Sequence, residues 1–431
     1  MKKIYNIGKS LLYPINRSLT GQGVRKTLKI IKKEIPKLQI KSIKSGTKVF
    51  DWNVPPEWNV NSAYVLDKNN KKIIDFKKNN LHLVGYSIPL KKTVSKEILL
   101  KNLFYLKKQP NAIPYVTSYY RKRWGFCVSY REFLKIKKKY SKIDKFKIVI
   151  ESKFNNKGFL NFGELILKGT SKQEILISTY ICHPSLANNE LSGPMVAMGL
   201  IKKFSKKKLN KTIRFIFIPE TIGSISYLNI NLENLKENVI GGYNLSCIGD
   251  ERQHSCMFSK YKNSPSDDAI IEAYKKLKIN KYKIYSFLER GSDERQFNSP
   301  GIDLKISSIF RTKYAEYPEY HTSLDTFKIV TLKGLIGGLK VAQKSIEILL
   351  ENIYPKTKIL CEPKMSKRKL YSDLSIKKTN KKFNLTKGLM DFLQYSDGTN
   401  SLEKISNLIN LNLTKTKKIF KILKNNKLIS Y

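Results

Sequence analysis

The stretch "STYICHPSLANNELSGPMVA", residues 178–197, joins the end of an apolar run to the start of a helical pattern. The run EILISTYIC stops at His183, and a polar loop follows before the apolar spacing becomes helical. One of only four histidines in the chain therefore lies at the end of a buried strand. A polar group without a partner is costly there, so the sequence predicts a site at this point.

Strands and helices alternate from about residue 147 to residue 352. Apolar runs typical of buried strands include KIVIES, EILISTYI, TIRFIFIPE, VIGGYNLSCIG and LKISSIF, and helical patterns such as LSGPMVAMGLIKKF and LKGLIGGLKVAQKSIEILLENI lie between or after them. This alternation is typical of a mostly parallel sheet covered by helices on both faces.

The composition limits the class of protein. The chain has 431 residues, and its five cysteines are scattered without a CxxC pair, which favours a reducing compartment and excludes a cysteine-only zinc site. We find no signal peptide and no apolar run of about 18 residues, so we expect a cytoplasmic protein without a membrane span. The net charge of +48 would suit nucleic acid, but the lysines are spread along the whole chain, as in proteins with a compositional bias.

Polar residues follow four of the predicted strands. His183 ends the first, Glu220 the second and Asp250 the third, and His321 lies in the loop after the last. Ligands of open parallel sheets bind at the carboxyl ends of the strands, where these side chains would meet. Imidazole nitrogen and carboxylate oxygen are zinc ligands, and a carboxylate that stays off the metal can take a proton from water. The four residues together favour a metal site, although each alone could be a hydrogen-bonded histidine or a helix cap.

The order of the segments HPS…NNELSG, PETIG, GD, SDERQF…PGI and EYHTSLDT resembles the zinc-dependent exopeptidase superfamily. Within it, the chain is most similar to poorly characterised aminopeptidase-like proteins, some of them named for polysaccharide biosynthesis. The resemblance implies a three-layer α/β/α zinc-peptidase-like core with a mostly parallel sheet, an inserted β-rich module and a small C-terminal winged-helix-like domain. We expect these boundaries: 1–48 and 146–353 for the core, 49–145 for the inserted module, 354–382 for a linker and 383–431 for the winged-helix-like domain.

The resemblance also implies a role for each residue at a strand end. His183 matches the first histidine ligand, Asp250 the carboxylate that shares its metal, and His321 the ligand of a second metal. Glu220 matches the general base.

Two ligands of the two-zinc enzymes are replaced in this chain. The bridging aspartate falls on Asn189 and the ligand glutamate on Thr221. An amide oxygen can bind one metal, but it carries no charge to hold two dications together. We therefore expect one zinc rather than two, held by His183, His321 and a carboxylate, with Asn189 also a candidate ligand. Glu190 could supply the charge or act as the base, and the choice between Glu190 and Glu220 stays open.

Substrate-binding candidates follow in "RGSDERQFNSPGI", residues 290–302. Asp293 and Glu294 could bind an amino group and Arg295 a carboxylate, whereas the plain alternative is a helix start that favours acids. Tyr320, next to His321, could stabilise an oxyanion or only pack the loop.

The carboxyl-terminal helices are rich in lysine, for example in KTKKIFKILKNNK. A generic basic face lacks the polar side chains that contact base edges, so we favour protein contact or packing on the core over sequence-specific binding of nucleic acid.

These features predict a metal-dependent hydrolase of aminopeptidase type that cleaves a peptide or amide bond in a small substrate. One alternative is a catalytically degenerate peptidase-fold protein with a binding or regulatory role. A second is a carbohydrate-modifying amidase or deacetylase of polysaccharide biosynthesis, which would use the same zinc chemistry. Assembly as a homo-oligomer is left open.

Overall fold

A computed structural model describes residues 1–118, 121–370 and 385–431 of the chain. Its centre is an eight-stranded sheet in the order β1-β10-β12-β11-β13-β16-β14-β15. The four middle strands, β12, β11, β13 and β16, are parallel to one another. An antiparallel pair joins β12 to β10 on one side, and another joins β16 to β14 on the other. The strands are β1 (Gln39–Lys44), β10 (Phe159–Leu167), β11 (Glu174–Tyr180), β12 (Thr212–Ile218), β13 (Val239–Leu245), β14 (Ser255–Met257), β15 (Lys283–Tyr285) and β16 (Ile306–Phe310).

Helices cover both faces of this sheet, because its middle strands are apolar on both sides. Along β11, Ile175 and Ile177 belong to one hydrophobic core and Leu176 belongs to the other. The predicted α/β class with a mostly parallel sheet is confirmed. The first core includes helices α2 (Gln22–Glu34), α5 (Ser192–Phe204), α7 (Pro265–Lys276) and α9 (Leu332–Glu351), and the second includes α6 (Ile222–Asn238) and α8 (Glu294–Phe297).

Helix α5 begins in close contact with the sheet. A Cβ atom at Gly193 would lie 2.2 Å from the carbonyl oxygen of Leu245 and 2.3 Å from Oγ1 of Thr179. Only glycine permits this approach, so Gly193 allows the start of α5 to pack directly against β13 and β11. A π-helical turn, Ala187–Leu191, leads into the helix.

The inserted β-rich region forms a four-stranded antiparallel sheet in the order β5-β4-β9-β6. Strand β9 begins at the boundary expected between the module and the core, at 145/146. It pairs with β4 and β6, so residues 146–155 lie in the sheet of the module and not in that of the core. The pattern KIVIES fits a strand in either sheet, and only pairing decides between them. The elements are β4 (Glu57–Leu66), β5 (Lys72–Asp75), β6 (Leu90–Ser95), β9 (Lys145–Asn155), α3 (Lys96–Lys101) and α4 (Tyr130–Lys139), with short pairs β2 (Lys48–Val49), β3 (Trp52–Asn53) and β7 (Leu103–Phe104), β8 (Phe126–Cys127).

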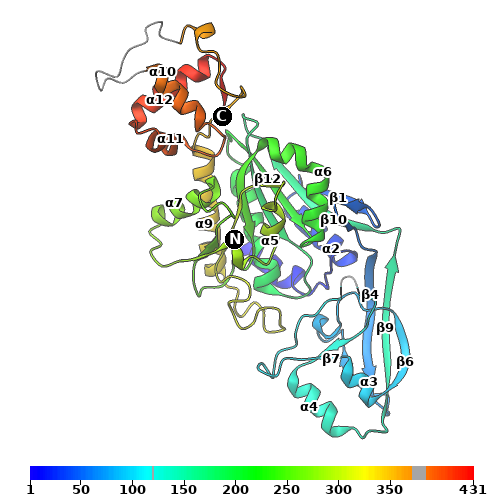
Figure 1. The fold of residues 1–431 in the computed structure, drawn as a ribbon. Helices are drawn as coiled ribbons and strands as arrows, with labels where there is room; N and C mark the ends of the chain where they lie inside the picture. Colours follow the sequence, from blue (N-terminus) through cyan, green and yellow to red (C-terminus); the bar gives the residue numbers. More distant parts are fainter. Residues whose placement is uncertain (119–120, 371–384) are drawn as a thin grey trace.

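The carboxyl-terminal helices and the inserted module lie at opposite ends of the molecule (Figure 1). Helices α10 (Leu385–Gln394), α11 (Leu402–Leu408) and α12 (Leu413–Asn425) share a small core of their own. Strand β18 (Ile429–Ser430) pairs with β17 (Lys356–Thr357), which leaves the end of the chain beside the start of the expected linker. Residues 371–382 of that linker and 383–384 of the next domain lie outside the described residues. Among the residues with described structure, no helix is long and apolar enough to cross a membrane.

Three local features differ from what the local sequence patterns indicate. SISYLNI, residues 224–230, has the pattern of a short helix, but α6 continues to Asn238. HLVGYSI, residues 82–88, has the alternation of a strand, but it contains isolated bridges instead. The sequence did not predict β14 and β15, which have only three residues each and depend on pairing with β16 and with each other.

A buried carboxylate joins the inserted module to the core. Glu57 on β4 accepts hydrogen bonds from both Nη atoms of Arg25 on α2, at 2.8 and 2.6 Å, from Nδ2 of Asn59 and from the backbone N–H of Phe159 on β10. The hydrogen bonds from Arg25 are the main cause that lowers the pKa of Glu57 to about 2, against the effect of burial.

We predict that Glu57→Gln lowers the free energy of unfolding at pH 7 by about 1.5–3 kcal/mol, as expected for a charge-assisted hydrogen bond. Because the folded pKa is depressed, this stabilisation is complete above the unfolded pKa near 4.5 and is lost as the pH falls toward 2. Urea unfolding at pH 7 and pH 3 should therefore show a smaller difference between the variant and the wild type at pH 3. Glu97→Gln, in an exposed pair with Lys101, is the control and should change little at either pH.

Candidate active site at the carboxyl edge of the sheet

The four strand-end residues lie after neighbouring parallel strands. His183 follows β11, Glu220 follows β12 and Asp250 follows β13, while His321 lies in the loop between β16 and α9. All four strands end at the same edge of the sheet, which gives their loops a common location.

The rings of His183 and His321 lie beside each other, with centroids 5.3 Å apart. His183 is only 2% exposed. Nε2 of His321 is buried and has no hydrogen-bond partner among the described residues. Tyr115 packs its ring 5.1 Å from both imidazoles, and Tyr320 stacks on His321 at 3.9 Å. Two imidazoles from distant parts of the chain thus share one buried space.

A buried ion pair holds the ring of His183. Nδ1 of His183 lies 3.0 Å from Oε2 of Glu190, and Oε1 of Glu190 lies 3.1 Å from Nε of Arg17. The side chains of Arg17 and Glu190 are both 0% exposed. Nε of Arg17 also donates to the carbonyl oxygen of His183 at 2.8 Å. Because Nδ1 is engaged by Glu190, the ring presents Nε2 to the shared space.

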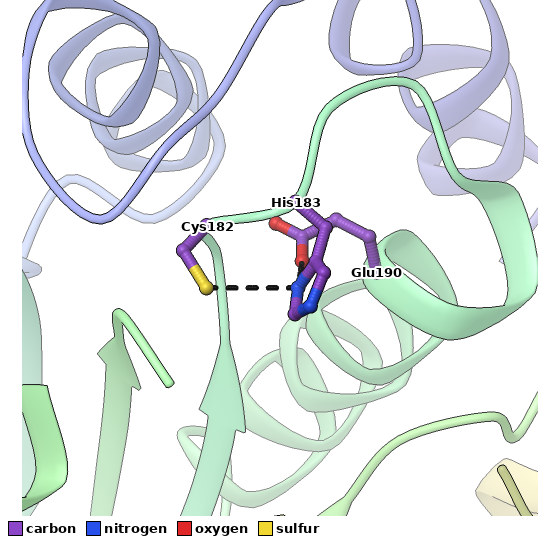
Figure 2. Close-up of side chains that lie close together, drawn as sticks. All are labelled: Cys182, His183 and Glu190. Atoms are coloured by element: carbon purple, nitrogen blue, oxygen red, sulfur yellow. Dashed lines mark hydrogen bonds and ion pairs between the residues drawn. The ribbon is translucent and has the colours of Figure 1, made fainter. Parts of the chain in front are cut away.

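One group of potential metal-binding side chains lies close together: Cys182, His183 and Glu190 (Figure 2). In the described parts of the chain, it is the one group of three such residues whose ligand atoms all lie within 4.8 Å of one another. Three facts argue against a metal among them. Arg17 already neutralises Glu190, and Nδ1 of His183 faces that carboxylate. Burial raises the pKa of the Cys182 thiol well above its usual range, and its sulfur accepts a hydrogen bond from the backbone N–H of Glu220. We interpret the group as a support behind the histidine.

Glu220 approaches His183 from the opposite side. Its Oε2 lies 3.6 Å from Nε2 of His183, and its Oε1 accepts a hydrogen bond of 2.6 Å from the hydroxyl of Ser292. Burial raises the pKa of Glu220 and outweighs the opposing effects of His183, Ser292 and Arg295. A carboxylate with a raised pKa accepts a proton more readily than one in water, as a general base must.

The two histidines have pKa values shifted in opposite directions. Burial lowers the pKa of His183, but the hydrogen bond that its Nδ1 donates to Glu190 and the charges of Glu220 and Glu190 raise it above 6.5 on balance. Burial and the charge of His183 lower the pKa of His321 well below 6.5, so His321 is neutral. A neutral imidazole with an unpartnered nitrogen is the form that binds a metal.

Asn189 lies in the π-helical turn before α5. Its Nδ2 donates to the hydroxyl of Tyr180 at 2.7 Å, and its Oδ1 is buried without a hydrogen-bond partner among the described residues. Asp325, which the sequence analysis missed, orients this turn by accepting from the backbone N–H groups of Asn188 and Asn189 at 2.6 and 2.9 Å. Burial raises the pKa of Asp325 to about 6, and these hydrogen bonds oppose the effect.

Asp250 uses its carboxylate oxygens within the protein. Oδ1 accepts from Thr312 Oγ1 and the backbone N–H of Arg252, and Oδ2 accepts from Nδ2 of Asn188 and the backbone N–H of Thr312, at 2.7 to 3.1 Å. These four hydrogen bonds occupy the acceptor positions of a carboxylate. The structure brings Asp250 into contact with Asn188 and Thr312 and records no contact between Asp250 and either histidine.

The acids of the segment SDERQF point into the protein. Oδ1 of Asp293 accepts from the backbone N–H of Thr221 and the hydroxyl of Ser224, and burial raises the pKa of Asp293 to about 7. Glu294 accepts hydrogen bonds from two backbone N–H groups and from the side chains of Asn244, Ser308 and Tyr314. Both side chains are fully buried, whereas Arg295 is half-buried beside Thr221.

The sequence analysis missed Arg17, Tyr115 and Asp325 as well as the support role of Glu190. Tyr115 comes from the inserted module, and its backbone N–H donates to the carbonyl oxygen of His321 at 2.8 Å. Next to it, Pro114 and Thr322 form an isolated antiparallel bridge. The residues of NAIPYV gave no local indication of this contact with a loop two hundred positions later.

The chain matches two protein families. Residues 5–352 match a family described as a domain of unknown function, DUF4910, and residues 352–431 match a winged helix-turn-helix family. A Clostridium acetobutylicum protein named "Putative polysaccharide biosynthesis protein with aminopeptidase-like domain" is 40% identical over 370 residues, which are 86% of this chain and 83% of that protein.

Solved structures share the fold. A Clostridium acetobutylicum protein described as a "putative peptidase" has a TM-score of 0.78 and 37% identity, covering 100% of this chain and 96% of that one. BSAP, a zinc aminopeptidase from Bacillus subtilis, has a TM-score of 0.60 and 14% identity, covering 81% and 94%. The similarity that the sequence motifs indicated, a peptidase fold followed by a winged-helix domain, is thereby confirmed.

We predict that Glu190→Ala lowers the free energy of unfolding by about 3–5 kcal/mol, because Arg17 would remain buried without its counter-charge. The double variant Arg17→Met with Glu190→Ala should recover most of this loss, since it removes both charges. Chemical unfolding of the four proteins of this double-mutant cycle measures the coupling. Strictly additive losses would show that the two side chains do not interact as described.

Proposed function

This chain belongs to the DUF4910 family, and from that premise we propose that it is a metal-dependent hydrolase of aminopeptidase type that cleaves a peptide or amide bond. The supporting observation is the pair of imidazoles 5.3 Å apart with Glu220 beside His183. The aminopeptidase fold supports the same reaction class.

The donor atoms of three residues have the chemistry that zinc accepts. The candidate ligand atoms are Nε2 of His183, Nε2 of His321 and Oδ1 of Asn189, of which the latter two are buried and unpartnered among the described residues. When bound, zinc polarises a carbonyl oxygen and lowers the pKa of a water molecule. One ion is favoured over two because the two carboxylates that hold a second ion in the two-zinc enzymes correspond here to Asn189 and Thr221, which carry no negative charge. Asp250 would have to give up hydrogen bonds to serve as a ligand.

Glu220 is the candidate general base in this proposal, and Glu190 is not. Glu190 is paired with Arg17 and holds Nδ1 of His183, so it lies behind the imidazole. The hydrogen bond from Ser292 fixes Oε1 of Glu220 and leaves Oε2 to take a proton from the attacking water. The same oxygen returns the proton to the leaving nitrogen as the carbon–nitrogen bond breaks.

Tyr320 is the candidate that stabilises the oxyanion. Its ring is fixed by stacking on His321, and burial raises the pKa of its hydroxyl, which therefore stays protonated as a donor. The other tyrosine of this loop, Tyr317, donates its hydroxyl to Asp325 instead.

A sugar-bound amide is the second candidate substrate class. It is suggested by the printed name of the Clostridium acetobutylicum relative, which refers to polysaccharide biosynthesis. The site chemistry would be the same, and only the substrate would differ. A protein with a purely binding role would not need Glu220 as a base. The Glu220→Gln variant described below therefore separates a binding role from hydrolysis.

We predict that the purified wild type binds about one zinc per chain at pH 7.5, where a free imidazole is neutral. His183→Ala and His321→Ala should each lose most of this metal, measured by inductively coupled plasma mass spectrometry after dialysis. His254→Gln is the matched control, because His254 contacts Arg311 and should not affect the metal content. A wild type without metal would reject the proposal, and two ions per chain would reject the single-ion assignment.

We predict that Glu220→Gln retains zinc but lowers kcat by about 10²- to 10⁴-fold, the usual contribution of a general base. Glu237→Gln, at the exposed far end of α6, controls for the loss of one carboxylate. Activity that persists in Glu220→Gln would assign the base to another residue.

A further inference from the structure

The guanidinium of Arg295 lies beside the turn that follows Glu220, and its hydrogen-bond acceptors among the described residues carry no charge. Nε of Arg295 donates to the carbonyl oxygen of Ser292 at 3.0 Å, and Nη2 donates to Oγ1 of Thr221 at 2.7 Å. Both acceptors are neutral. Among the described residues no carboxylate lies within 4.0 Å of this guanidinium, although Asp293 and Glu294 precede it directly in the chain.

The residue that Arg295 contacts, Thr221, has a strained backbone conformation. Thr221 has φ 65° and ψ −80°, a γ-turn conformation that is rare for a residue with a side chain. Two neighbours keep it there: Asp293 accepts from its backbone N–H, and Arg295 donates to its hydroxyl. Thr221 follows Glu220 directly in the chain, so the strain and the guanidinium bound to Thr221 lie next to the candidate base, and such strain is concentrated at functional sites.

The same site has little to offer an ammonium group. Asp293 and Glu294 are buried and hydrogen-bonded to the protein, and Glu190 is paired with Arg17. Glu319, next to Tyr320, is ion-paired with Arg252. Apart from Glu220, the acids named here are buried or ion-paired, so the half-buried guanidinium of Arg295 is the charged group that remains for a substrate, and it favours an anionic one.

We propose that the substrate carries a carboxylate close to its scissile amide bond and that Arg295 binds this carboxylate. The planar guanidinium offers paired N–H groups that match the two oxygens of a carboxylate. This inference rests on the proposed function and specifies its substrate class. An N-acyl amino acid is the simplest example: water adds to the acyl carbonyl, the carbon–nitrogen bond breaks, and a carboxylic acid and an amino acid result.

The test compares matched substrates with the zinc-loaded full chain. Acetate release is measured from a panel of N-acetyl-L-amino acids and from the corresponding N-acetyl-L-amino acid amides, and ammonia release from L-amino acid amides, which have a free amino group. For the wild type we expect kcat/KM for the carboxylates to exceed that for the neutral amides by roughly 10- to 100-fold, the effect of one charge-assisted pair. Arg295→Gln should abolish this preference, because kcat/KM for the carboxylates should fall at least 10-fold more than kcat/KM for the neutral amides. Arg290→Gln, an exposed arginine five positions earlier, should behave as the wild type.

A binding measurement separates this inference from the proposed function. The N-acetyl-L-amino acids and their amides are titrated by calorimetry into wild type, Arg295→Gln and Arg290→Gln. Carboxylate binding that depends on Arg295, without hydrolysis of any amide, would support the inference and reject the hydrolase. Hydrolysis of the L-amino acid amides in preference to the N-acetyl-L-amino acids would support the hydrolase and overturn the inference. Equal binding of carboxylates and amides by wild type and Arg295→Gln would also overturn it, because a merely structural Arg295 predicts that result.

Discussion

The buried ion pair between Arg17 and Glu190 is the interaction on which the candidate site depends. Neither side chain is exposed to solvent, so each charge would be very costly without the other. Through this pair the segment that precedes α2 is joined to the π-helical turn before α5. The pair also fixes His183 twice, by its ring nitrogen and by its carbonyl oxygen. A histidine held in this way loses little freedom when it binds a ligand, which is the advantage of a preorganised site.

The inserted module is part of the site. Tyr115 packs against both histidines, and the segment around it pairs with the loop that carries His321. The core of the module is continuous with the hydrophobic layer under α6, and Glu57 ties the module to α2 and β10. The module therefore closes one side of the space between the histidines, and its docking and the shape of the site are coupled.

Carboxylates near this edge of the sheet divide into two groups by their surroundings. Glu220 has one hydrogen bond from Ser292 and an oxygen directed at His183. Asp250, Asp325 and Glu294 instead accept three or more hydrogen bonds each from backbone N–H, hydroxyl and amide donors, and they shape the loops on which the other residues lie. Residue type alone does not separate the two groups, because both contain the same functional group.

The sequence by itself determined the central strands, most helices and the location of His183, Glu220 and His321 at strand ends. Continuous apolar runs and helical spacing are local properties, and parallel pairing brings the strand ends to one edge. Only the tertiary structure decided that β9 belongs to the inserted module, that β14 and β15 extend the sheet, and that Asp293 and Glu294 point inward. It also brought Arg17 to Glu190 and Tyr115 to both histidines. The physical reason is that a hydrogen bond, an ion pair or a ring contact depends on partners that are distant in the sequence, and local patterns contain no information about such partners.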